Sequence, residues 1–225
     1  MNARIIPLAA LLFGLATLAT FMWLGMSPEV SAIYTRDEIA LATSEFQRSV
    51  TLGDLARVFG DPPNAEIVAA HQIVNERDLY AFIPAYTLFL IAAALMIGGA
   101  RNPATWIAMV FALLGGAADA VETSIQLRIL ADVANAEQHL PVATWHWLKY
   151  SALALNGLAI SALCLLAIRK RWIIGVVALL PLPFVLFAWA GFSSPRLFSI
   201  AFALYWITLL VLALIETVRG RGAQG

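Results

Sequence analysis

Long apolar runs separated by short polar segments dominate the chain of 225 residues. Each of these runs is close to the roughly 20 residues that a helix needs to cross about 30 Å of hydrocarbon. The runs are residues 5–26, 80–99, 104–124, 148–168, 172–191 and 197–216. The pattern predicts an all-α fold in which about six transmembrane helices form a polytopic membrane helix bundle.

The first apolar run also has features of a secretory signal peptide. Val30, Ser31 and Ala32 follow it and resemble a small-residue cleavage site. The run is longer than the apolar core of about 7–15 residues in such peptides, and Arg4 is its one flanking charge. We therefore expect residues 5–26 to remain in the protein as a signal anchor.

The segment between the first and second spans, residues 27–79, is polar, and we call it the cap. Thr35 followed by Glu38 fits the capping box that starts a helix. Apolar residues recur at helical spacing until Gly60 ends that helix, and Asn64 can start another that continues into the second span. The recurring apolar residues are Leu52, Leu55, Val58 and Phe59. The pattern predicts a helical extramembrane cap, lying on the membrane surface or over the mouth of the bundle.

The composition agrees with a membrane protein and excludes several function classes. Hydrophobic residues make up 61% of the chain and charged residues 12%, against about 45–50% and about 25% in soluble domains. Because 14 basic residues balance 14 acidic ones, no basic surface for nucleic acid is expected. Cys164 is the single cysteine of the chain, which excludes an intramolecular disulfide.

The charged residues are divided unequally between the two ends of the predicted spans. The cap contains four arginines and nine acidic residues, whereas the opposite ends carry seven cations beside Glu216. The seven cations are Arg4, Arg101, Arg169, Lys170, Arg171, Arg219 and Arg221. Since cytoplasmic loops carry the excess of lysine and arginine, we predict cytoplasmic N- and C-termini and a cap on the non-cytoplasmic side.

Prolines interrupt two of the predicted spans. Pro84 lies in the second span, and Pro181 and Pro183 lie in the fifth. Each removes a backbone donor and should kink its helix. Such a kink is either ordinary irregularity of a membrane helix or the sign of a widened cavity near Pro84.

Ionisable residues inside the spans give the strongest functional indication, because a charge in hydrocarbon usually has a partner or a role. Asp119 and Glu122 are three residues apart and share one face of the third span. Lys149 enters the fourth span at a similar depth, and Asp78 lies at the start of the second. The predicted cluster, either a ligand-binding site or an ion-pair network, comprises Asp78, Asp119, Glu122, Lys149, Arg77, His146 and Asn156, with Arg196 as a further neighbouring cation.

Three carboxyl groups meet one ammonium group in this cluster. We expect a carboxyl there to hold a proton or to bind a cation unless another cation joins. The alternatives are pairing that fixes helix register, a site for a ligand, lipid or ion, and catalysis. No recognised catalytic signature occurs in the chain, and His139 with its acidic neighbours matches no metal motif, so neither catalytic residues nor a cofactor is assigned and no metal site is expected.

Several short motifs surround these residues. The relevant stretches are Asp78, then Phe82-Ile83-Pro84-Ala85-Tyr86, then Ala118-Asp119-Ala120-Val121-Glu122-Thr123, and Lys149. The chain resembles an uncharacterised group of bacterial multi-pass inner-membrane proteins with an A-D-x-x-E motif in a transmembrane helix, although Thr123 stands where the group has Asn. The resemblance implies that Asp119, Glu122 and Lys149 act as a unit, and that the protein resides in a bacterial inner (plasma) membrane.

Three functional hypotheses follow from the sequence. The first is binding or transport of a lipid, small amphiphile or cation at a polar pocket formed by the cluster. The second is an intramembrane enzyme that uses a carboxylate pair on a lipid-like substrate. The third is an accessory subunit of a larger membrane complex. The expected partners are membrane lipids and either partner membrane subunits or further copies of the chain, with no nucleic acid.

Overall fold

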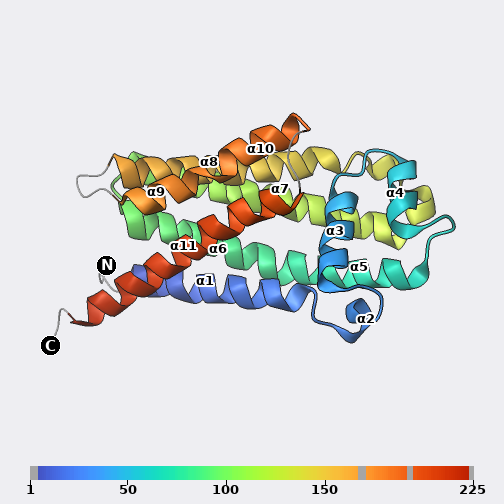
Figure 1. The fold of residues 1–225 in the computed structure, drawn as a ribbon, viewed down its shortest axis with the longest axis horizontal. Coiled ribbons are helices and arrows are strands. Elements are labelled where there is room, and N and C mark those ends of the chain that lie inside the picture. The colour runs from blue at the N-terminus through green and yellow to red at the C-terminus, as the bar shows by residue number, and fades with distance from the viewer. Residues whose placement is uncertain (1–4, 167–170, 192–194, 223–225) are drawn as a thin grey trace. The chain divides into compact units, whose positions relative to one another are not determined.

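A computed structural model of the protein describes residues 5–166, 171–191 and 195–222. Every regular element in these ranges is a helix (Figure 1). Six of the helical segments are long and apolar enough to cross a membrane: Ile5–Leu24, Ala65–Gly98, Pro103–Ala131, Ala143–Leu165, Trp172–Trp189 and Leu197–Arg219. The predicted all-α bundle with six spans is confirmed, and the protein is a multi-pass integral membrane protein.

Some of the spans contain more than one helical element, which hydropathy alone does not indicate. In chain order they are α1 (Ile5–Leu24), α2 (Pro28–Ser31), α3 (Arg36–Gln47), α4 (Leu52–Phe59), α5 (Ala65–Arg77), the π-helical turn η1 (Asp78–Phe82), α6 (Ile83–Gly98), α7 (Pro103–Ala131), the 3-10 segment η2 (Val133–His139), α8 (Ala143–Leu165), α9 (Trp172–Leu179), α10 (Pro181–Trp189) and α11 (Pro195–Gly222).

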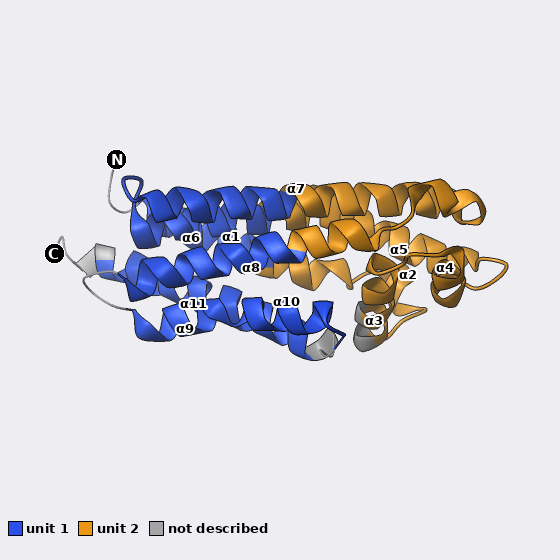
Figure 2. Cartoon of the chain, turned by 90° about the horizontal axis from the view of Figure 1, so that it is seen from above, with its two compact units in different colours: residues 1–17, 85–116, 150–225 blue, residues 18–84, 117–149 orange. Residues whose placement is uncertain are grey.

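The chain forms two compact units, coloured separately in Figure 2. Unit 1 comprises Met1–Thr17, Ala85–Gly116 and Tyr150–Gly225. Unit 2 comprises Leu18–Pro84 and Ala117–Lys149, and therefore includes the whole cap.

Local capping explains where the cap helices begin and end. Thr35 and Glu38 form the predicted capping box at the start of α3, and Asn64 caps α5 through the backbone N–H groups of its first turn. Gly60 ends α4 at a φ of 86°, a left-handed backbone that glycine adopts without strain. A second capping box, formed by Thr51 and Asp54, starts α4. The predicted helical organisation of the cap is thus confirmed.

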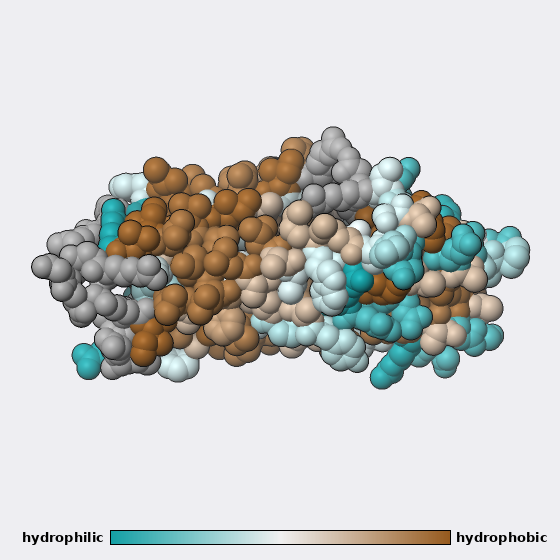
Figure 3. Space-filling view, turned by 90° about the horizontal axis from the view of Figure 1, so that it is seen from below, coloured by the Kyte–Doolittle hydropathy of each residue, from teal (hydrophilic) through white to brown (hydrophobic). Residues whose placement is uncertain are grey.

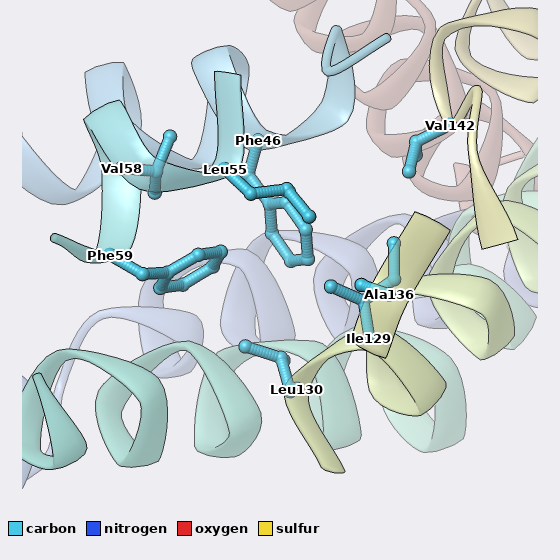
Figure 4. Packing of buried hydrophobic residues seen from close by; sticks show 8 residues of the cluster. All are labelled: Phe46, Leu55, Val58, Phe59, Ile129, Leu130, Ala136 and Val142. Atoms are coloured by element: carbon cyan, nitrogen blue, oxygen red, sulfur yellow. The ribbon is translucent and has the colours of Figure 1, made fainter. Parts of the chain in front are cut away.

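A hydrophobic cluster joins the cap helices to α7 within unit 2 (Figure 4). Its buried members are Phe46, Leu55, Val58, Phe59, Ile129, Leu130, Ala136 and Val142. The Phe46 and Phe59 rings meet edge to face with centroids 4.9 Å apart. His71 of α5 is fully buried beside both rings, so the polar cap has an aromatic interior.

The helix that starts in the cap continues into the second span without a break. Its regularity changes at η1, where the Ile83 N–H donates to the Asp78 carbonyl five residues earlier. Pro84 follows directly and cannot donate an N–H of its own. The predicted irregularity at Pro84 is therefore a widened π-helical turn on its N-terminal side. In the fifth span, α9 gives way to α10 at Leu180, immediately before Pro181.

Close helix packing in unit 1 depends on small residues. Gly157 of α8 faces α9 so closely that a Cβ built on it would lie 2.4 Å from the Ala178 carbonyl oxygen. Small residues allow this approach between membrane helices, where van der Waals packing rather than water exclusion stabilises the pair.

The outward surface of the spans is apolar. Figure 3 shows one face of the molecule, on which hydrophobic side chains gather over a broad area and hydrophilic side chains gather in a separate one. Only 17% of the most apolar window of α1 is buried in the protein, and large side chains such as Ile173 are 78% exposed. Exposed apolar surface of this extent is suited to lipid rather than water.

We predict that Gly157→Ala destabilises the protein by about 1–3 kcal/mol, because its methyl group meets backbone that cannot rotate away. Gly53 of α4 is the matched control, since a Cβ there has its nearest neighbour, Thr51 Oγ1, at 3.6 Å. Gly53→Ala should leave stability unchanged or raise it by about 0.5–1 kcal/mol. Thermal unfolding in detergent checks both, and equal stability of the two variants would contradict the packing.

The stability of the first turn of α4 should depend on pH. Backbone N–H groups of Val50 and Thr51, followed by the Arg57 guanidinium, lower the pKa of Asp54 from 3.8 to about 2. The stabilisation by Asp54 is therefore complete above pH 3.8 and is lost as the pH falls towards 2. Because Asp54 lies at the surface of the cap and is partly exposed to solvent, we expect a loss below about 1 kcal/mol. Amide hydrogen exchange of α4 in wild type and Asp54→Asn measures it; the same acid-dependent loss of protection in both would contradict the prediction.

Candidate functional site

The third span supplies the core of the candidate site. Asp119, Glu122 and Gln126 lie three and four residues apart on α7, so their side chains share one helix face. Asp119 is 4% exposed, and the other two side chains are fully buried. Ionised carboxylates in such surroundings require a partner, because burial removes their hydration.

Lys149 of α8 provides that partner. Its Nζ atom lies 2.9 Å from Asp119 Oδ1 and 2.7 Å from Glu122 Oε2. The lysine itself is 3% exposed. One buried ammonium group therefore bridges two carboxylates that stand one turn apart on the neighbouring helix.

His146 lies one turn before Lys149 on α8. Its Nδ1 atom is 3.5 Å from Glu122 Oε1, and the residue is 4% exposed. The first turn of α8 is attached to the cap, since the Ser49 carbonyl accepts the N–H groups of Val142 at 3.1 Å and Ala143 at 3.4 Å. The cap thus positions the imidazole beside Glu122.

Asp78 occupies the edge of the cluster. It opens the π-helical turn η1, is partly exposed, and accepts a hydrogen bond from Thr123 Oγ1 at 3.3 Å. Among the described residues, no cationic group lies at ion-pair distance from its carboxyl group. Asp78 therefore differs from Asp119 and Glu122 in both accessibility and charge pairing.

Two members of the site were absent from the predicted set. Gln126 donates from Nε2 to Glu122 Oε1 at 3.2 Å, while its own Oε1 is buried and accepts no hydrogen bond from the part of the chain that the structure describes. Thr123 is 1% exposed and joins Asp78 to α7. The sequence offered a signal for both residues. Gln126 is four residues after Glu122, and residues at i+4 share a helix face. Thr123 directly follows Glu122 in the motif.

Two residues of the predicted cluster make contacts with other parts of the chain, and a third residue considered with it is not described. Arg77 donates from Nη1 to the Trp23 carbonyl at 2.8 Å, and its guanidinium lies 4.5 Å from the centre of the Trp23 ring. Asn156 belongs to unit 1, where its amide donates to the Ala108 carbonyl at 2.8 Å and accepts from Tyr205 Oη at 2.7 Å. The side chain of Arg196 lies outside the described residues.

The cluster in unit 2 therefore contains Asp78, Asp119, Glu122, Lys149 and His146. Three carboxyl groups face a single ammonium group, and a neutral imidazole leaves that excess of negative charge uncompensated. Charge balance in a buried site requires a further proton or cation. The arrangement can hold a positive charge beside Asp78.

No protein-family model, curated protein or solved structure matches the chain. The resemblance to bacterial multi-pass inner-membrane proteins stays a prediction.

We predict that Lys149→Met destabilises the protein by about 3–5 kcal/mol, since it leaves two buried carboxylates without their cation. Arg128→Met is the control, because Arg128 is an exposed cation near the end of α7 and should cost no more than about 0.5 kcal/mol. Neutralising the carboxylates as well, in Lys149→Met/Asp119→Asn/Glu122→Gln, should recover most of the loss. Unfolding in mixed detergent micelles measures the stability of all three variants. A triple variant no more stable than Lys149→Met would argue that the loss of stability does not come from the unpaired carboxylates.

Proposed function

We propose that the protein binds a ligand carrying one positive charge at the carboxylate cluster of unit 2, with Asp78 as the receiving group. The proposal rests on one observation: the three carboxyl groups differ in charge pairing and in exposure to solvent. Asp119 and Glu122 are paired with Lys149 at 2.9 and 2.7 Å. Asp78 has a hydroxyl contact at 3.3 Å and is partly exposed.

The electrostatics of the cluster favour a cation at Asp78. Its carboxyl group stands beside two others, whose combined charge the lysine offsets only in part. An arriving cation gains attraction from all three carboxylates, in surroundings where attraction is less screened than in water. An anionic ligand would meet the opposite field.

The chemistry of the site narrows the ligand to an ammonium head group of an amphiphile or a monovalent cation. No three His, Cys, Asp or Glu side chains of the described ranges are grouped as a metal site requires. Asp78 lies where the polar helix α5 meets the apolar helix α6, and Tyr80 on the same turn is 77% exposed. An amphiphile can place its amine at this junction and its chain along the apolar surface.

The location of this site in the cell follows from the charge distribution along the chain. The acidic cap belongs to unit 2, as does the cluster, whereas Arg101 and Arg171 belong to unit 1. By the positive-inside rule, we propose that the cap faces the non-cytoplasmic side of a bacterial inner membrane and that both termini are cytoplasmic. The ligand would then reach Asp78 from outside the cytoplasm or from the adjoining leaflet.

The test is ligand-dependent stabilisation of the purified protein in a neutral maltoside detergent. Sodium chloride and dodecylammonium chloride are the two probes, and each is added at the same ionic strength to wild type and to every variant. A probe present at about 100 times its Kd should stabilise wild type by about 2.7 kcal/mol. Asp78→Asn should abolish the effect of whichever probe binds, because it removes the ionisable carboxyl group and keeps the shape of the side chain.

Glu76→Gln is the matched control, since Glu76 is an exposed acidic residue two positions before Asp78. Its Oε1 atom accepts a hydrogen bond from Gln72 Nε2 at 2.9 Å. It should bind the probe as wild type does. Stabilisation by sodium alone identifies a monovalent cation, and stabilisation by dodecylammonium alone identifies an amphiphile. Wild type unaffected by both probes, or Asp78→Asn stabilised as strongly as wild type, would overturn the proposal.

A further inference from the structure

A histidine in the interior of the cap has no polar partner. His71 lies on α5 and is fully buried. Neither nitrogen of its imidazole ring has a hydrogen-bond partner among the residues that the structure describes. A neutral imidazole carries one N–H donor and one acceptor nitrogen, and almost all buried polar atoms of proteins are hydrogen-bonded. His71 is not part of the carboxylate cluster, so its burial calls for a separate explanation.

Three aromatic rings surround the imidazole instead of polar groups. The centre of the Tyr34 ring lies 5.8 Å from that of His71 at an angle of 87°, and Phe46 lies at 5.8 Å and 88°. Phe59 is closer, at 5.3 Å and 78°. Edge-to-face contacts of this kind stabilise aromatic packing. They suit a neutral ring, because they need no counter-ion and no water.

The imidazole also lies between two hydrophobic clusters of unit 2. Phe46 and Phe59 belong to the cluster drawn in Figure 4. A second buried cluster, against which Tyr34 packs, consists of Val30, Ile39, Ala70 and Val74. Helices α2, α3 and α4 therefore converge on α5 around His71, and the closed cap depends on the packing of this ring.

A proton on the His71 ring would find no compensating charge in the closed cap. The carboxylates of the cap helices whose side chains are described are all exposed or partly exposed, and none lies at ion-pair distance from His71: Glu29, Glu38, Glu45, Asp54, Glu66 and Glu76. The described cations of the same helices, Arg48, Arg57 and Arg77, would repel a further positive charge.

The Tyr34 phenol is the titratable group in contact with the ring. Burial, followed by the charge of Glu38, raises the pKa of Tyr34 above its ordinary value of 10.0, so the phenol stays neutral. An imidazolium would be attracted to the faces of the aromatic rings, but it would lose the hydration that a charged group has in water. The closed cap therefore favours the neutral imidazole.

We propose that His71 is an acid-sensitive switch, and that protonation of its imidazole opens the cap by separating α3 and α4 from α5. A hydronium ion of the solvent supplies the proton, an N–H bond forms at the acceptor nitrogen, and water hydrates the resulting imidazolium in the open cap. An imidazole in water has a pKa of about 6.5. Because the closed cap binds fewer protons than the open one, its stability is complete above about pH 6.5 and falls as the pH is lowered. This switch does not depend on the cation site proposed at Asp78.

Amide hydrogen exchange of the full chain in detergent, measured at pH 7 and pH 5 and corrected for the intrinsic exchange rate, tests the switch. Each pH unit below about 6.5 should raise the population of the open cap about tenfold. We therefore expect the protection of α3 and α4 to fall at least about tenfold between the two pH values, while α6 keeps its protection. The capping carboxylate Asp54, whose pKa is lowered to about 2, stays ionised throughout this range.

Substitutions of the three histidines assign the effect to one ring. His71→Phe keeps an aromatic ring in the site and removes the titrating group, so protection of α3 and α4 should differ by less than about twofold between pH 7 and pH 5. His71→Leu serves the same purpose with a smaller side chain. His139→Gln and His146→Gln are the controls, because His139 is partly exposed in η2 and His146 lies at the carboxylate cluster. Both controls should keep the acid-dependent loss of wild type.

Several results would overturn the inference. Protection of α3 and α4 that stays constant between pH 7 and pH 5 in wild type rejects the switch without the use of any variant. An acid-dependent loss that persists in His71→Phe and His71→Leu, or that disappears in His146→Gln, assigns the effect to another group. An equal loss of protection in α6 shows that acid unfolds the whole chain instead of opening the cap.

Discussion

The ammonium group of Lys149 is the contact on which the arrangement of unit 2 depends. A buried ion costs several kcal/mol in lost hydration, and a shared counter-ion offsets this cost only when the geometry is close. The lysine meets Asp119 and Glu122 together only if both project from the α7 face turned towards α8. Rotating α7 by one residue would turn them about 100° away. The ion pairs of Lys149 therefore constrain the rotation of α7 against α8 within unit 2.

A backbone irregularity sets the third carboxylate apart. Pro84 cannot supply an N–H to the preceding turn, and the helix widens at η1, where Ile83 donates to the Asp78 carbonyl. Asp78 begins this turn and contacts Thr123 rather than Lys149. Pro84 thus affects the position of Asp78 as well as the shape of the helix.

The sequence was sufficient for those features that depend on local physics. Hydropathy alone predicted six spans, and the caps at Thr35, Gly60 and Asn64 follow from hydrogen-bonding groups close in the chain. It also placed Asp119 and Glu122 on one face, because helical periodicity fixes relative direction within a single helix. The capping box of Thr51 and Asp54 had the same kind of signal.

No local pattern in the sequence indicated the contacts that Arg77 and Asn156 make. Periodicity gives the depth and face of a residue, and it leaves open how each helix is rotated against its neighbours. Arg77 is long enough to reach the Trp23 ring and carbonyl of α1. Asn156 shares a face with Lys149 but lies two turns further along α8, where Tyr205 of α11 meets it. These partners depend on tertiary packing, which one helix at a time does not encode.

Structural and functional roles need not compete within the cluster, because they rest on different residues. Lys149 and its two carboxylates form a network whose disruption would destabilise the fold, and such a network is a poor place for a ligand to bind and leave. Asp78 is partly exposed and has no cation at ion-pair distance among the described residues, so in the proposed function a ligand can bind and leave there while the helix register stays fixed. A ligand at Asp78 would therefore leave the ion pairs of Lys149 with Asp119 and Glu122 in place.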